Sequence, residues 1–111
     1  MTADRIDAVE FYWRQGCGFC MSLHRKLERH GIPMAKHNIW EDPAAAAYVR
    51  SVANGNETVP TVRVGSAAMV NPSLDQVVEA LRAEAPHLVP DDYEPQAPGA
   101  VSRLLDKLLG D

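Results

Sequence analysis

The sequence predicts one α/β domain, in which a mixed four-stranded sheet carries helices on both faces. Apolar, β-branched runs alternate with helical patterns over residues 6–85, in the order strand, helix, strand, helix, strand, strand, helix. The first three elements form a βαβ unit, whose crossover is right-handed by default. The last two strands are separated only by Gly65-Ser66, which predicts a hairpin. The whole chain of 111 residues is long enough for one hydrophobic core.

The first strand is expected over residues 6–13 and the first helix over residues 18–30. Within this helix Cys20, Leu23 and Leu27 recur at helical spacing and form an apolar stripe. The stripe places Cys20 on the buried side, whereas Cys17 lies ahead of the first turn and is expected to stay accessible. Trp13, at the end of the strand, is expected to pack in the core or at the strand end, with a role as a stacking platform as the alternative.

The second strand is predicted over residues 33–40, and its Trp40 is expected to pack like Trp13. Asp42-Pro43 then predicts a helix start, because an acidic N-cap is followed by proline at the first helical position. This second helix is expected to continue over residues 44–53, which are rich in alanine.

The third strand is predicted over residues 58–64 and the fourth over residues 67–70. Pro60 lacks an N–H group, so it must lie at the beginning or the edge of its strand. Ser73 and Gln76 match a capping box, which predicts a third helix from Ser73 to about residue 85.

The end of the chain changes in character after this domain, which spans residues 1–85. Residues 86–98 are rich in proline and acidic residues and predict an extended tether. Residues 99–111 predict a short amphipathic helix, expected either to pack on its own domain or to dock a partner. Its apolar residues recur at helical spacing: Val101, Leu104, Leu105, Leu108 and Leu109.

Composition excludes several partner classes. The net charge of −4 comes without a basic stripe, so no nucleic-acid partner is expected. No apolar run approaches the ~20 residues that a membrane span needs, so no membrane partner is expected. The N-terminal residues show no signal-peptide pattern, and two cysteines in an unexported chain indicate a reducing compartment. We therefore expect a cytoplasmic monomer.

The two cysteines of the chain form the motif Cys17-Gly18-Phe19-Cys20 at a strand-to-helix junction. This placement is typical of a thiol–disulfide redox site. Unpaired N–H groups and the dipole at the helix N-terminus favour a thiolate at Cys17, and the thiolate is the reactive nucleophile. A purely structural bridge would close too small a loop to restrict the unfolded chain much.

Two other uses of these cysteines stay open: a pair of buried structural thiols, or metal binding. Two thiols are half of a tetrahedral zinc site, and no histidine stands at ligand spacing from them, so no resident metal is expected. An iron–sulfur cluster shared between two chains through Cys17 is the remaining metal alternative.

Three segments together carry a family resemblance over residues 8–85. The Cys-x-x-Cys motif, the run Thr58-Val59-Pro60 before a strand, and Asn71-Pro72-Ser73 before the last helix resemble the glutaredoxins, in particular the mycoredoxins of actinobacteria. The resemblance implies a thioredoxin-like fold of the glutaredoxin type. It also implies a cis peptide bond before Pro60 that faces the cysteines.

The resemblance implies roles for individual residues. Cys17 would be the exposed nucleophile and Cys20 the resolving thiol, while the backbone of Val59 would pair with the sulfur-bearing residue of the substrate. Gly16 stands where mycoredoxins usually carry a bulky aromatic residue, which leaves an opening beside Cys17. The expected substrate-binding residues are Arg14, Gly16, Gly18, Phe19, Thr58, Val59, Pro60, Asn71, Pro72 and Ser73.

The sequence therefore predicts a thiol–disulfide oxidoreductase without a tightly bound cofactor. Its expected co-substrate is mycothiol, or else glutathione, and its expected partners are S-mycothiolated or disulfide-containing proteins. The alternative enzyme is a dithiol electron donor fed by thioredoxin reductase. The alternative outside enzymes is a binding module of the thioredoxin fold or an iron–sulfur carrier.

Overall fold

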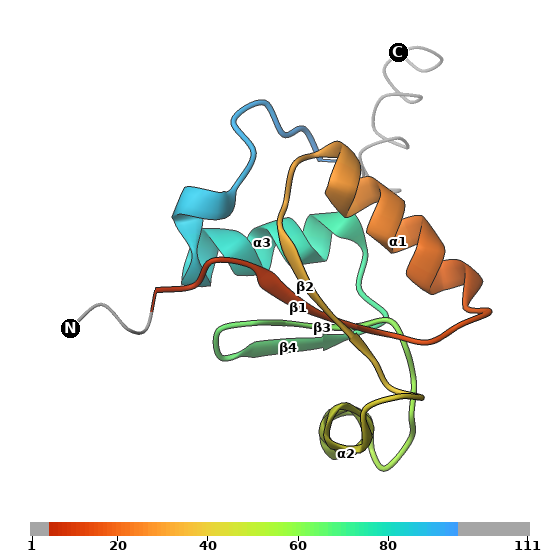
Figure 1. The fold of residues 1–111 in the computed structure, drawn as a ribbon. Coiled ribbons are helices and arrows are strands. Elements are labelled where there is room, and N and C mark those ends of the chain that lie inside the picture. Colours follow the sequence, from red (N-terminus) through yellow and green to blue (C-terminus); the bar gives the residue numbers. More distant parts are fainter. Residues whose placement is uncertain (1–4, 96–111) are drawn as a thin grey trace, which may run out of the picture.

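The computed structural model describes residues 5–95, which form one mixed sheet with helices on both faces (Figure 1). The strand order is β2-β1-β3-β4, with β1 and β2 parallel and the other two pairs antiparallel. This confirms the predicted fold class. The elements are β1 (Val9–Trp13), α1 (Gly18–Arg29), β2 (Met34–Asn38), α2 (Pro43–Val52), β3 (Thr61–Val64), β4 (Ala67–Val70), α3 (Leu74–Glu84) and a 3₁₀ turn, η1 (Pro86–Leu88).

Three of the strands are shorter than predicted, whereas β4 has the predicted bounds. Each of these three strands is three residues shorter than predicted, and β3 starts at Thr61, directly after the cis peptide bond between Val59 and Pro60. Pro60 thus precedes the first strand residue, as its missing N–H group requires.

Each helix begins at a capping residue that satisfies free backbone N–H groups. The Cys17 sulfur accepts from the Cys20 amide at the start of α1. Asp42 accepts from the amides of Ala44 and Ala45 at the start of α2. The Ser73–Gln76 capping box is present at the start of α3. Within residues 5–95 no helix combines the length and apolar character needed to cross a membrane.

Alternation along β1 divides the interior into two cores, one on each face of the sheet. Val9 and Phe11 point toward α1 and α3, where they join the larger core. Tyr12 points to the other face, where it joins a smaller core against α2. Figure 1 shows α1 and α3 together on one side of the sheet and α2 alone on the other. We call these sides the α1/α3 face and the α2 face.

The start of the predicted tether folds back onto the domain instead of extending away from it. Within residues 86–95, η1 is followed by Val89 and Tyr93, both of which pack against the larger core. The Tyr93 hydroxyl donates a hydrogen bond to Asp75 in the first turn of α3. The tether prediction is therefore wrong for residues 86–95, because apolar side chains between the prolines find a buried surface. Residues 96–98 and the predicted helix over residues 99–111 lie outside the described residues.

Candidate redox site

The cysteine pair lies at the junction between the end of β1 and the start of α1. Cys17 is the N-cap of the helix with an extended backbone, and Cys20 lies in its first turn. A disulfide bond joins the two residues, whose Cα atoms are 5.2 Å apart. That separation falls in the ordinary range for disulfides, so the loop and helix hold the two sulfurs at bonding distance.

Backbone groups surround the Cys17 sulfur. The Cys20 amide donates to it at 3.1 Å, and the Val59 carbonyl oxygen lies 3.6 Å from it. The amide and the helix N-terminus favour a negative charge on this sulfur when the disulfide is reduced. The carbonyl belongs to the loop before Pro60, so this loop faces the cysteines as the resemblance implied.

Cys17 is less accessible than the sequence suggested. It is 6% exposed, against 1% for Cys20, and both cysteines belong to the larger core. The prediction of an exposed Cys17 is therefore wrong for this oxidised state. The reason is that the disulfide turns the sulfur toward Cys20 while the Val59 loop covers it.

The rim beside the cysteines is open on the helix side. Gly16, with a φ of +75°, and Gly18 are both exposed, and a Cβ built at Gly18 would meet no atom within 4 Å. Phe19 is 71% exposed. A substrate that approaches Cys17 from this side would meet glycine backbone and one aromatic ring.

Arg14 and Trp40 form a contact that sequence reasoning missed. Trp40 is 60% exposed, so the prediction that it packs in the core or at a strand end is wrong. Its ring instead lies 5.4 Å from the Arg14 guanidinium carbon, a cation–π distance. The signal was available, because both residues follow strands that run parallel, and the ends of parallel strands meet at one sheet edge.

Hydrogen bonding connects the Val59-Pro60 loop with the segment before α3. The Asn71 amide donates to the Pro60 carbonyl at 2.7 Å, and Asn71 adopts a φ of +51°. Pro72 is buried, and Ser73 is occupied as the cap of α3. The contacts run from Cys17 to Val59 and from Pro60 to Asn71. The structure thus brings together three of the predicted segments, namely residues 17–20, 58–60 and 71–73.

Metal-ligating side chains do not gather around the pair. In the described part of the chain, no three residues of the types His, Cys, Asp and Glu lie close enough together to hold a metal ion.

Comparison with known proteins identifies the family. Residues 9–67 match the family model for glutaredoxin. Glutaredoxin-type proteins from two strains of Mycobacterium tuberculosis are each 38% identical over 71 residues, which is 63% of this chain and 84% of each relative.

Solved structures agree on the fold. The glutaredoxin-like NrdH-redoxin of Escherichia coli is 25% identical, with a TM-score of 0.57 over 65% of this chain and 92% of its own. A mutant thioredoxin-like protein, 16% identical, superposes with a TM-score of 0.58 over 66% of this chain and 97% of its own. A glutaredoxin of Brucella melitensis, 23% identical, reaches a TM-score of 0.53 over 81% and 96%. The chain is a redox protein of the thioredoxin fold with a Cys17–Cys20 pair, and it belongs to the glutaredoxin family.

Proposed function

We propose that this protein reduces mixed disulfides between proteins and a low-molecular-weight thiol, with mycothiol as its co-substrate. The observation that carries the proposal is the position of the Cys17 sulfur between the Cys20 amide at 3.1 Å and the Val59 carbonyl at 3.6 Å. One partner favours the thiolate that attacks, and the other belongs to a strand-like edge that can align a substrate backbone.

The reaction begins when the Cys17 thiolate attacks the mycothiol sulfur of the mixed disulfide. A bond between Cys17 and mycothiol forms, and the protein sulfur leaves as a thiolate that takes a proton from water. A second mycothiol thiolate then attacks the bound mycothiol sulfur, which releases mycothiol disulfide and restores the Cys17 thiolate. The incoming free mycothiol is thus the reductant: its sulfur is oxidised to the disulfide level while the protein sulfur returns to a thiol.

The same intermediate can also be resolved by a second route, in which Cys20 takes part. Its thiolate attacks the Cys17 sulfur, releases mycothiol and leaves the Cys17–Cys20 disulfide that the structure contains. Because Cys20 is 1% exposed, it reaches Cys17 across one helical turn but does not reach an external substrate. Cys17 is then the attacking thiol and Cys20 the resolving thiol.

The walls of the site suit a bulky thiol more than a dicarboxylate. Gly16 and Gly18 leave space beside Cys17, and Asn71-Pro72-Ser73 stands where glutathione-using glutaredoxins commonly carry Gly-Gly followed by an acid. Mycothiol presents a sugar–inositol head to this wall rather than two charged ends. Arg14, Phe19 and Thr58 border the same opening in this proposal. A reducing compartment, such as the cytoplasm, suits the reaction.

A second candidate function is that of a dithiol electron donor reduced by thioredoxin reductase. Two observations favour it: the closed disulfide with Cys17 only 6% exposed, and the likeness to the NrdH-redoxin of Escherichia coli, a glutaredoxin-like protein with a thioredoxin-like activity profile. In this case both cysteines are needed for every turnover, and no low-molecular-weight thiol takes part.

The rate at which the oxidised protein is reduced distinguishes the two candidate functions. Three reductants are compared under identical conditions: mycothiol with its disulfide reductase, glutathione with its reductase, and thioredoxin reductase alone. The first proposal predicts the fastest turnover with mycothiol and partial activity of Cys20→Ser on a mycothiolated protein. Turnover with thioredoxin reductase alone, combined with a fully inactive Cys20→Ser, would replace it by the dithiol donor.

A further inference from the structure

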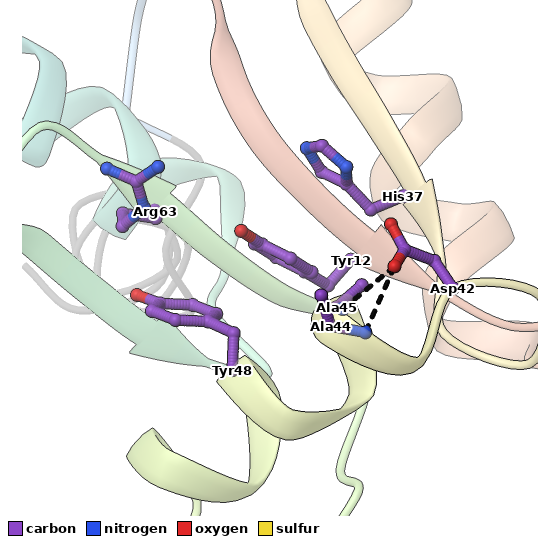
Figure 2. Close-up of a pocket in the computed structure, with 7 residues that line it drawn as sticks. All are labelled: Tyr12, His37, Asp42, Ala44, Ala45, Tyr48 and Arg63. Carbon is purple, nitrogen blue, oxygen red and sulfur yellow. Dashed lines mark hydrogen bonds between the residues drawn. The ribbon is translucent and has the colours of Figure 1, made fainter.

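A cavity of about 430 Å³ opens on the α2 face of the sheet, away from the core that holds the cysteines (Figure 2). Its volume falls in the range of small-molecule sites. Side chains from three strands and one helix line it: Tyr12, His37, Asp42, Ala44, Ala45, Tyr48 and Arg63. Nothing in the proposed thiol chemistry uses this cavity.

Three rings form a continuous stack along the cavity. Tyr12 lies between His37 and Tyr48, with ring centroids 4.8 Å and 4.9 Å apart and interplanar angles of 22° and 29°. Both faces of the Tyr12 ring are therefore covered, and its hydroxyl is the group that remains to contact a ligand. Figure 2 shows the hydroxyl groups of both tyrosines directed to the side where Arg63 lies.

Arg63, in the middle of β3, supplies a positive charge at this place. Its guanidinium carbon lies 5.7 Å from the centroid of the Tyr48 ring, and Nη1 donates to the Gly65 carbonyl at 3.1 Å. Arg63 is half-buried and forms no ion pair with any acid of residues 5–95. Its remaining N–H donors are available to a ligand.

Two acids close to the cavity, Glu10 and Asp42, are engaged by other groups. Glu10 stands directly across from Arg63 in the β1–β3 register, but its Oε1 lies 2.7 Å from His37 Nε2. Asp42 accepts from the first amides of α2 at 3.0 and 3.3 Å, so its carboxylate satisfies the helix N-terminus. The cavity thus combines an unpaired cation with two phenol hydroxyls.

We propose that this cavity binds a small molecule through its carboxylate, with the Arg63 guanidinium and the hydroxyls of Tyr12 and Tyr48 as donors. A guanidinium fork matches the two oxygens of a carboxylate, and one unpaired cation suits a single negative charge. Burial raises the pKa of Tyr48, only partly offset by the nearby Arg63 charge, so this phenol keeps its proton and donates at neutral pH. The aromatic rings give the ligand's body an apolar wall.

The test compares benzoate with benzamide, its neutral analogue, by NMR titration of the full chain. Benzoate is expected to cause saturable shifts at the Arg63 side chain and at the amides around Tyr48, whereas benzamide causes none there. Equal shifts by both probes, or benzoate shifts confined to other cations such as Arg14, would overturn the proposal.

Variants assign the effect to the named donors. Arg63→Gln is expected to weaken benzoate binding at least about tenfold and Tyr48→Phe about threefold or more, because each loses a hydrogen bond to a charged group. Arg50→Gln is the matched control, since Arg50 is exposed on α2 and pairs with Glu57 at 2.6 Å. Benzoate binding unchanged in both Arg63→Gln and Tyr48→Phe, or equally weakened in Arg50→Gln, would contradict a carboxylate site at Arg63.

Discussion

The α1/α3 face of the sheet buries two sulfurs among apolar side chains, whereas the α2 face keeps charged and phenolic groups around an open cavity. On the first face the polar partners of Cys17 are backbone groups, the Cys20 amide and the Val59 carbonyl. On the second face the polar groups are side chains, held by ring stacking and by the pair of His37 with Glu10.

This difference affects how well each face tolerates the replacement of a side chain. Backbone partners persist when a neighbouring side chain is replaced, so the redox site depends on the sulfurs and on the local path of the chain. A cavity built from side chains loses a donor with each replacement. Val59 joins the two faces, because its side chain packs against both cores while its carbonyl faces Cys17.

The largest effect on activity is expected from replacing the cysteines. Cys17→Ser should reduce the rate of disulfide reduction by at least about a thousandfold, because a hydroxyl is a far weaker nucleophile than a thiolate at neutral pH. Cys20→Ser should retain part of the activity on a mixed disulfide. The measurement is the turnover of a mycothiolated protein, with Arg63→Gln on the other face as the variant expected to retain wild-type turnover. Appreciable activity of Cys17→Ser would reverse the assignment of the two cysteines.

A matched pair of valines compares the packing of the two cores. Val77 in α3 and Val49 in α2 are both fully buried, each on a different face. Val77→Ala should lower the free energy of unfolding by about 2–3 kcal/mol and Val49→Ala by about 1–2 kcal/mol, because the cost depends on how far the site can collapse. The smaller core lies beside an open cavity and can relax.

Urea unfolding of both variants tests this comparison, with Val70→Ala as the control. Val70 is 39% exposed, so its truncation should change stability by less than about 0.5 kcal/mol. A larger loss in Val49→Ala than in Val77→Ala would show that the α2 face is the more tightly packed of the two.

Alanine substitutions at the two glycines beside Cys17 should change the free energy of unfolding in opposite directions. Gly16→Ala should destabilise by about 1–3 kcal/mol, because a φ of +75° is strained for a residue with a Cβ. Gly18→Ala should stabilise by about 0.4–1 kcal/mol, because Gly18 opens α1 and a Cβ there meets nothing. Thermal unfolding of both oxidised variants gives the comparison. Equal shifts would mean that the loop carries no strain at Gly16.

On both faces of the sheet, the sequence predicts features set by neighbouring residues far better than features set by distant ones. Cys17 and Cys20 share one helical turn, and Ser73 and Gln76 one capping box, so spacing alone places each pair. Arg63, in contrast, meets Tyr48 only through the fold. The burial of Cys17 escaped prediction for the same reason, since it depends on the Val59 loop, which is distant in the sequence.

The smallest expected effect concerns the ionisation of the Tyr48 hydroxyl. Burial raises its pKa above 10.0, the Arg63 charge lowers it in part, and Tyr12 adds to the rise. The unfolded chain therefore releases this proton at a lower pH than the folded chain. It follows that the contribution of Tyr48 to stability is complete below pH 10.0 and is lost as the pH rises through the folded-state pKa.

An absorbance titration of the folded protein measures this proton, because phenolate absorption reports the three tyrosines of the chain. Tyr48→Phe should remove a phase that titrates above pH 10.0, and Arg63→Gln should move that phase to still higher pH, because the cation that favours the phenolate is gone. A phase that moves down in Arg63→Gln would mean that Arg63 acts on Tyr48 by desolvation rather than by charge. Burial alone would then set the pKa of Tyr48, and the α2 face would no longer differ from the α1/α3 face by the action of a charged side chain.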